Sequence, residues 1–207
     1  ATGTDASGIW ASTWAGLAYV WRSRALRWFV VGTVVFVAFA AIDNVVLVFL
    51  VEDGLDGSAT TYGLVQACFG VGMLVGSIGL GVQRRPPGAR ALVVAGAGAT
   101  SAGSLLTAVA PDLVAAGGAQ ALAGVGNGAE IVATNTYVRH LVPTALLGRV
   151  FGAVGTSAQV GSSLAYLAGA PLVAEVGPRS AFTVAGLGTI IGLLFLLIGT
   201  RTRPANL

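Results

Sequence analysis

Two acidic side chains, Asp43 and Glu130, lie inside long apolar stretches of the chain, where an ionised carboxylate is costly in lipid. Counted from the ends of these stretches, Asp43 lies somewhat outside the membrane midplane and Glu130 in the cytoplasmic third, so the two are not expected to pair. No basic residue lies at either depth, so each carboxyl must meet water, a partner from outside the chain or a proton. Two hypotheses follow for each acid: a proton-coupled role, or a neutral carboxyl hydrogen-bonded to a neighbouring helix.

Amides and hydroxyls form stripes in the same part of the sequence. Gln120, Asn127 and Thr134 are seven residues apart, and Glu130 falls in the same sector of a helix. A second patch at helical spacing is formed by Gln159, Ser162, Ser163 and Tyr166. Such stripes either line a polar path or hold helices together by hydrogen bonds. The candidate site residues are Asp43, Gln120, Asn127, Glu130, Gln159 and Tyr166.

The elements that must position these residues are membrane helices. Apolar residues make up 55% of the chain and charged residues 9%, whereas about a quarter of the residues in a soluble domain are charged. Each apolar run is close to the roughly 20 residues that cross a bilayer as a helix. We therefore predict an all-α membrane protein with six transmembrane helices, at 27–51, 61–82, 91–110, 113–138, 150–173 and 180–200.

The basic residues predict which way these helices run. All 11 are arginines, and all but Arg179 lie in alternate gaps between the apolar runs or at the two outer flanks. The remaining gaps contain acids instead. Because arginine in short loops is kept on the cytoplasmic side, we expect both termini in the cytoplasm of a plasma-membrane protein. The clustered arginines are Arg22, Arg24, Arg27, Arg84, Arg85, Arg90, Arg139, Arg149, Arg201 and Arg203.

A period of three spans is visible in the distribution of polar residues. The third and sixth spans, 91–110 and 180–200, contain no amide and no ionisable residue, so we expect both to be peripheral and to face lipid. This period predicts two inverted three-helix repeats. In the second span, Gly72 and Gly76 are expected to let a neighbouring helix approach closely.

Short motifs recur along the chain in a specific order. GLAYV at 16–20 precedes the first span, YGL at 62–64 opens the second, and GVGNG at 124–128 is followed by LVP at 141–143 and GRVFG at 148–152. From about residue 14 to residue 203 the chain resembles the C-terminal six-helix half of a major facilitator superfamily transporter. The branch it resembles includes enterobactin-exporter-like and macrolide-efflux-like permeases.

This resemblance implies half of a fold with about twelve helices, in which a small-molecule substrate binds between two halves near the membrane midplane. The partner would be an N-terminal six-helix half. The loop at 79–90 is similar to a degenerate copy of the family's cytoplasmic signature, with Gln83 at the acidic position. Residues 1–26, with Trp10 and Trp14 on the helical face that also carries Trp21 and Trp28, would combine a remnant of the central cytoplasmic loop with an interfacial amphipathic helix. Residues 27–200 would form the bundle and 201–207 a cytoplasmic tail.

The functional expectation is a proton-coupled exporter of small amphipathic molecules, similar to drugs or siderophores, that works by alternating access. The alternative is a six-helix membrane module that does not transport alone and acts with a partner half. Enzyme activity is not expected, because the single histidine, His140, lies in a predicted loop and neither a zinc-protease nor a P-loop motif occurs. Cys68 is the only cysteine, so no metal or other cofactor is predicted, and the placement of the arginines does not suggest nucleic-acid binding.

Overall fold

The computed structural model describes residues 18, 21, 23–82 and 88–201. Within these residues the regular elements are all helices, joined by short connections, and there is no strand. Most of the predicted interfacial helix, with Trp10 and Trp14, lies outside the described residues, as does the tail after Arg201. The described elements are α2 (Arg24–Phe49), η1 (Leu50–Gly54), α3 (Ala59–Gly81), α4 (Ala89–Ala108), α5 (Leu113–Leu141), η2 (Thr144–Leu146), α6 (Leu147–Val176) and α7 (Pro178–Arg201).

In the described part of the chain, four helical stretches are long and apolar enough to cross a membrane: Leu26–Gly54, Ala59–Gly81, Ala89–Ala108 and Pro178–Thr200. The all-α membrane class predicted from composition is therefore confirmed, and each predicted span falls mainly within one long helix. The helices α5 and α6 are long enough, but their glycines, amides and hydroxyls lower the mean hydropathy. That these two also cross the membrane stays a prediction.

Local sequence signals fix where several helices begin. Ser58 and Thr61 form a reciprocal capping box at the start of α3. The carboxylate of Asp112 accepts a hydrogen bond of 2.8 Å from the backbone nitrogen of Ala115 and so caps α5. Gly177 separates α6 from α7 with a φ of 79°, a conformation that favours glycine. These caps and the Gly177 turn set the starts of α3 and α5 and the break between α6 and α7.

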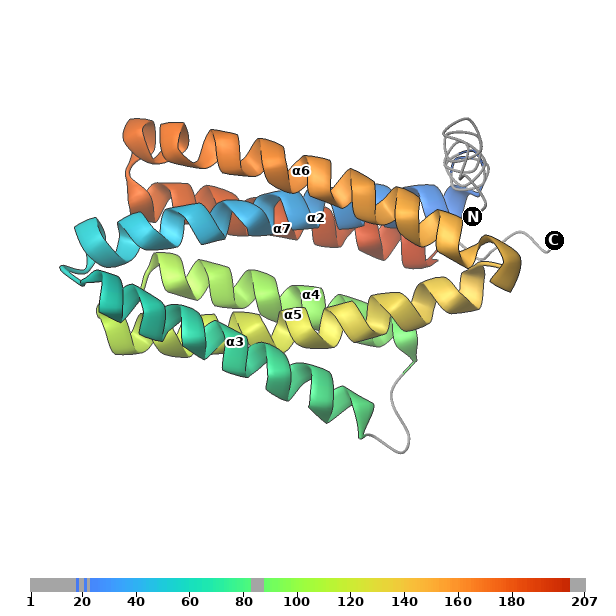
Figure 1. The fold of residues 1–207 in the computed structure, drawn as a ribbon, viewed down its shortest axis with the longest axis horizontal. Coiled ribbons are helices and arrows are strands. Elements are labelled where there is room, and N and C mark those ends of the chain that lie inside the picture. Colours follow the sequence, from blue (N-terminus) through green and yellow to red (C-terminus); the bar gives the residue numbers. More distant parts are fainter. Residues whose placement is uncertain (1–17, 19–20, 22, 83–87, 202–207) are drawn as a thin grey trace, which may run out of the picture.

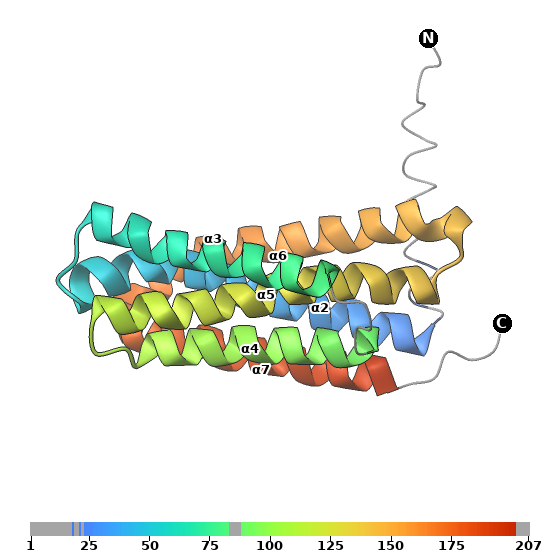
Figure 2. The ribbon, with the colours of Figure 1, turned by 90° about the horizontal axis from the view of Figure 1, so that it is seen from below.

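The long helices form two groups of three. In the first group α2 packs against α6 and α7, and in the second α5 packs against α3 and α4. The views in Figures 1 and 2 agree that these groups lie on opposite sides of the bundle. The main contact between the groups is made by α4 and α7.

The two ends of the bundle differ in charge. The connections from α2 to α3, from α4 to α5 and from α6 to α7 lie at the same end (Figure 1), and they contain or adjoin Glu52, Asp53, Asp56, Asp112 and Glu175. We call this the acidic end. The clustered arginines of the described residues flank the helices at the other end, here called the basic end.

Glycines bring the backbones of α3 and α5 into direct contact, as predicted for Gly72 and Gly76. A Cβ atom added to either residue would collide with a backbone carbonyl of α5, and one added to Gly124 or Gly128 would collide with a carbonyl of α3. Small residues at spacing four allow this close approach in membrane helices. The polar residues of α3 and α5 are thereby held at a fixed depth relative to one another.

The third and sixth spans each bury one face within the described bundle, and that their other faces meet lipid stays a prediction. In α4 the buried residues include Thr100, Ser101, Ser104 and Thr107, and in α7 they include Thr189. Their hydroxyls were not counted because the prediction considered only amides and ionisable groups. Hydroxyls are easily buried in helices because they donate to a carbonyl one turn earlier, as Ser101 does to Ala97 at 3.0 Å.

Candidate functional site

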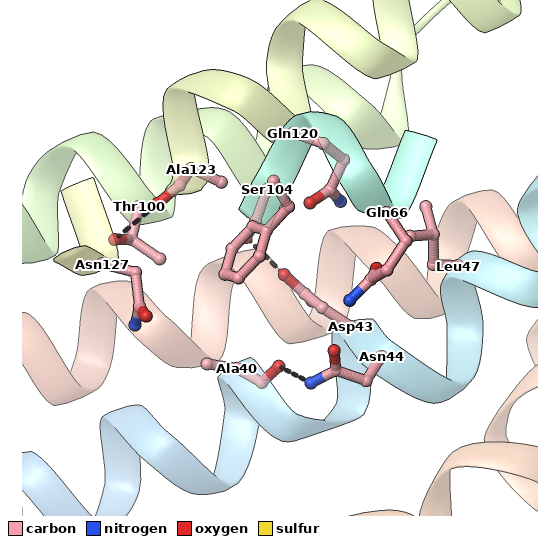
Figure 3. A pocket seen from close by; sticks show the side chains of 11 residues that line it. Ala40, Asp43, Asn44, Leu47, Gln66, Thr100, Ser104, Gln120, Ala123 and Asn127 are labelled. Atoms are coloured by element: carbon pink, nitrogen blue, oxygen red, sulfur yellow. Dashed lines mark hydrogen bonds between the residues drawn. The ribbon is translucent and has the colours of Figure 1, made fainter. Parts of the chain in front are cut away.

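A small polar cavity lies where α2 meets α3, α4 and α5 (Figure 3). The positions of its lining residues along these helices place it in the half of the bundle nearest the acidic end. The space open to the centre of a water-sized sphere is about 30 Å³, and about 10–15 Å³ of such space holds one water molecule. The cavity therefore has room for about two waters. Its walls are formed by Ala40, Asp43, Asn44, Leu47, Gln66, Phe69, Thr100, Ser104, Gln120, Ala123 and Asn127.

Asp43 is the charged residue of this cavity. It lies near the end of α2, and one carboxylate oxygen, Oδ2, accepts a short hydrogen bond from the hydroxyl of Ser104 in α4. The other oxygen, Oδ1, is enclosed and has no hydrogen-bond partner within the described chain. Leaving a buried carboxylate oxygen unpartnered is costly, so this atom marks a place where a proton, a water molecule or an ion would be stabilised.

Neutral polar groups from three other helices complete the walls. Gln66 of α3 and Gln120 of α5 flank the carboxylate, and the latter is only 4% exposed. The hydroxyl of Thr100 lies within hydrogen-bond distance of the carbonyl oxygens of Gly96, at 3.1 Å, and Ala123, at 3.3 Å. No basic residue and no second acid is among the lining residues, so the single carboxylate sets the charge of the cavity.

The cavity brings together three of the six predicted site residues, Asp43, Gln120 and Asn127. It also contains Gln66 and Ser104, which were not selected from the sequence. The amide of Gln66 stands out in an otherwise apolar run and could have been selected. Nothing in the sequence distinguishes Ser104 from the other serines, because its role depends on the packing of α4 against the rest of the bundle.

Glu130 lies outside the cavity. Its side chain is 6% exposed, and its Oε1 atom accepts a hydrogen bond of 2.7 Å from the hydroxyl of Thr134 in the same helix. A Cβ atom added to Gly96 would lie 2.8 Å from the backbone nitrogen of Glu130, which places the acid at the tight contact between α4 and α5. The hydrogen bond thus comes from its own helix, whereas the sequence-based alternative placed the partner on a neighbouring helix.

Gln159 and Tyr166 also lie outside the cavity, on an exposed face of α6. Tyr166 is 48% exposed, and Ser163 lies between them with its hydroxyl donating to the carbonyl of Gln159 at 2.9 Å. The structure therefore separates the predicted residues into a cavity, a buried helix contact and an exposed polar face.

The geometry limits what the cavity can bind. Pockets for drug-sized ligands have volumes of about 300–1,000 Å³, far more than this space. It can hold a proton on Asp43, one or two water molecules or a small ion. Any larger substrate must bind elsewhere, for example on a surface that more than one bundle forms.

Comparison with known proteins assigns the chain to a family. The family model described as Major Facilitator Superfamily matches residues 9–207, which is nearly the whole chain. A comparison with curated proteins gives no match. The match agrees with the long apolar helices, with the buried polar residues inside them and with the motifs noted in the sequence. The chain belongs to the Major Facilitator Superfamily, a family of membrane transporters.

Proposed function

We propose that this chain is the C-terminal half of a secondary active transporter that exports small amphipathic molecules by alternating access and is driven by protons. The observation that carries the proposal is the cavity around Asp43, in which a carboxylate oxygen that has no hydrogen-bond partner among the described residues lies between the two three-helix groups. A carboxyl in such a position changes its preferred surroundings when it gains or loses a proton. Protonation can therefore favour one arrangement of the groups over another.

The packing of the helices supports two inverted repeats, α2–α3–α4 and α5–α6–α7. An exchange of α2 with α5, α3 with α6 and α4 with α7 converts each main helix contact into another that is present. The contact of α2 with α7 becomes that of α5 with α4, and the contact of α2 with α6 becomes that of α5 with α3. The contact between α4 and α7 is converted into itself. This is the relation expected when the first helix of each repeat packs mainly against the helices of the other repeat.

The exposed polar face of α6 supports a second six-helix half. Gln159, Ser163 and Tyr166 are exposed on a helix that, in this proposal, spans the membrane. An amide facing lipid is costly, so this face is expected to meet protein or a water-filled cavity. A partner half placed there would form the larger substrate surface that the cavity around Asp43 is too small to supply. The alternative function, a six-helix module that acts only with a partner, uses the same face.

Orientation follows from the charges at the two ends. The basic end carries the clustered arginines of the described residues, and arginine-rich ends are kept in the cytoplasm. In this orientation both termini are cytoplasmic and the cavity lies nearer the external side of a plasma membrane. A secondary transporter placed this way can use the inward proton gradient for export.

The test uses the full-length protein in proteoliposomes with an imposed pH gradient, and the efflux of a fluorescent amphipathic dye such as ethidium is measured. We expect Asp43→Asn to abolish efflux driven by the gradient while exchange of dye down its own gradient persists. The matched control is Glu130→Gln, which changes a buried acid outside the cavity and is expected to retain gradient-driven efflux. Unchanged driven efflux in Asp43→Asn would remove the proton-coupled role of this residue. Failure of the wild-type protein to move any amphipathic dye would overturn the proposed substrate class.

A further inference from the structure

The cavity around Asp43 offers more space and more oxygen atoms than a proton requires. A proton on Oδ1 needs one hydrogen-bond acceptor and no volume of its own. The cavity instead has about 30 Å³ of space open to the centre of a water-sized sphere, enough for roughly two waters or one small ion. The enclosed Oδ1 atom has no partner within the described chain.

The hydroxyl of Ser104 is arranged so that its oxygen remains available as a ligand. Ser104 donates its hydrogen to Oδ2 of Asp43, and the hydroxyl of Thr100 is directed to backbone carbonyls of Gly96 and Ala123. A hydroxyl that donates its only hydrogen keeps two lone pairs on its oxygen. The Ser104 oxygen, which lies against the carboxylate, can therefore face a cation without giving up its hydrogen bond, whereas the Thr100 hydroxyl is turned toward Ala123 (Figure 3).

Amide groups add further oxygen atoms on the opposite walls. Figure 3 shows Gln66, Gln120 and Ser104 grouped around the carboxylate of Asp43. Each amide carries one carbonyl oxygen with two lone pairs, and rotation of the amide by half a turn exchanges its oxygen and nitrogen. Carboxylate, hydroxyl and amide oxygens are the ligands that hard cations prefer.

The charge of the cavity selects a monovalent ion. Asp43 is the only ionisable residue among the lining groups, which come from α2, α3, α4 and α5. One carboxylate neutralises one positive charge, whereas a divalent ion would leave an uncompensated charge in a low-dielectric bundle. The described residues also contain no group of three or more His, Cys, Asp or Glu that could hold a metal ion.

We propose that this cavity binds one sodium ion between the Asp43 carboxylate and the oxygens of Ser104, Gln66 and Gln120, and that sodium and a proton exclude each other there. Among the residues that the structure describes, no other titratable or charged group lines the cavity, so Asp43 alone sets the competition. The inference deepens the proposed function by naming a second ion for the same cavity. Sodium binding itself can be measured without transport.

The experiment measures binding of radioactive sodium to the purified full-length protein, together with its thermal unfolding in sodium, potassium and choline chloride of equal concentration. An ion that binds only the folded state raises the unfolding temperature in a saturable way. At pH values above neutral, we expect sodium to raise the unfolding temperature. Potassium should raise it much less, because the space is small. At pH values low enough to protonate Asp43, the apparent dissociation constant for sodium should rise about tenfold for each unit by which the pH falls.

Two variants keep the proposal open to refutation. Asp43→Asn removes the charge and should abolish sodium binding. Ser104→Ala keeps the charge but removes a ligand oxygen, and should weaken sodium binding by about tenfold, as loss of roughly one good interaction does. Glu130→Gln is the matched control and should bind sodium like the wild-type protein, since Glu130 is outside the cavity.

Equal effects of sodium and potassium, sodium binding retained in Asp43→Asn, or no sodium binding at any pH would overturn the inference. The outcomes also separate it from the proposed function. Normal proton-driven efflux without sodium binding would reject the sodium site alone, whereas sodium binding by a protein that moves no dye would reject the exporter alone.

Discussion

The contact between α3 and α5 gives the sharpest test of the packing. Gly72 and Gly76 face the backbone of α5, and a Cβ atom on the former would lie 3.0 Å from the nitrogen of Val125 and still closer to the carbonyl oxygen of Ala121. We predict that Gly72→Ala and Gly76→Ala each destabilise the protein. The matched control is Gly70→Ala in the same helix, where an added Cβ atom would have nothing within 4 Å.

The magnitude follows from two opposing effects. Replacing glycine with alanine in a helix is favourable by about 0.5–1 kcal/mol at any position without a clash. At Gly72 the backbones must separate by roughly 1 Å to restore ordinary contact distances, which forfeits a quarter to a half of the local dispersion energy. Overpacking of this kind costs about 1–3 kcal/mol. Because the helix gain is common to both sites, Gly72→Ala should be less stable than Gly70→Ala by about 1–3 kcal/mol.

The assay is thermal or detergent-induced unfolding of the purified full-length protein, with each variant compared directly with its control. A second pair on the partner helix repeats the comparison: Gly124→Ala against Gly118→Ala, because an added Cβ would collide at Gly124 and meet nothing within 4 Å at Gly118. If the interface and control variants changed stability by the same amount and in the same direction, the close backbone contact between α3 and α5 would be refuted.

Two further predictions concern the ends and the outer face of the bundle. The guanidinium of Arg179 donates to the carbonyls of Ala108 and Ala110, at and just beyond the end of α4, at 3.2 and 2.9 Å. Arg179→Ala should therefore lower the free energy of unfolding by about 1–3 kcal/mol, and Arg179→Lys should lower it less. Equal unfolding temperatures in the wild-type protein and both variants would contradict this role. In a Cys68→Ala background, Ser163→Cys should react with N-ethylmaleimide faster in the full-length protein, where we propose that this face lines a water-filled substrate surface, than in this chain alone, where the thiol meets lipid or detergent; equal rates would count against that surface.

Much of the fold follows from the sequence because apolar length and glycine spacing act locally. The runs around Asp43 and Glu130 are helices, and the close contacts at Gly72 and Gly76 are present. What the sequence does not contain is the choice of partner between helices. Ser104 became part of the site only because α4 packs where it does, and its hydroxyl resembles every other serine hydroxyl in an apolar run.

Only part of the candidate site could be predicted, because the sequence places residues on a helix face but does not determine which helix that face contacts. Residues on one helix share a face at predictable spacing, so the grouping of Gln120 with Asn127 could be deduced from the sequence. Glu130 lies only three residues from Asn127, yet it is directed to the contact with α4 and to Thr134. Gln159 and Tyr166 lie on the exposed face of α6, where we propose that a partner half binds, and helical spacing alone does not distinguish such a face from one that lines a cavity.

The glycine contacts also bear on how homologous sequences can vary. At Gly72, Gly76, Gly124 and Gly128 an added carbon would strike backbone atoms, which no substitution on the facing helix can remove. At Gly186, by contrast, it would lie 2.7 Å from Cδ2 of Leu105, a side chain that can become smaller. An alignment of homologues should therefore show the α3 and α5 glycines as fixed, and Gly186 as a position that covaries with position 105. Pair-based contact inference would then miss the backbone contact between α3 and α5 while finding the contact between positions 105 and 186.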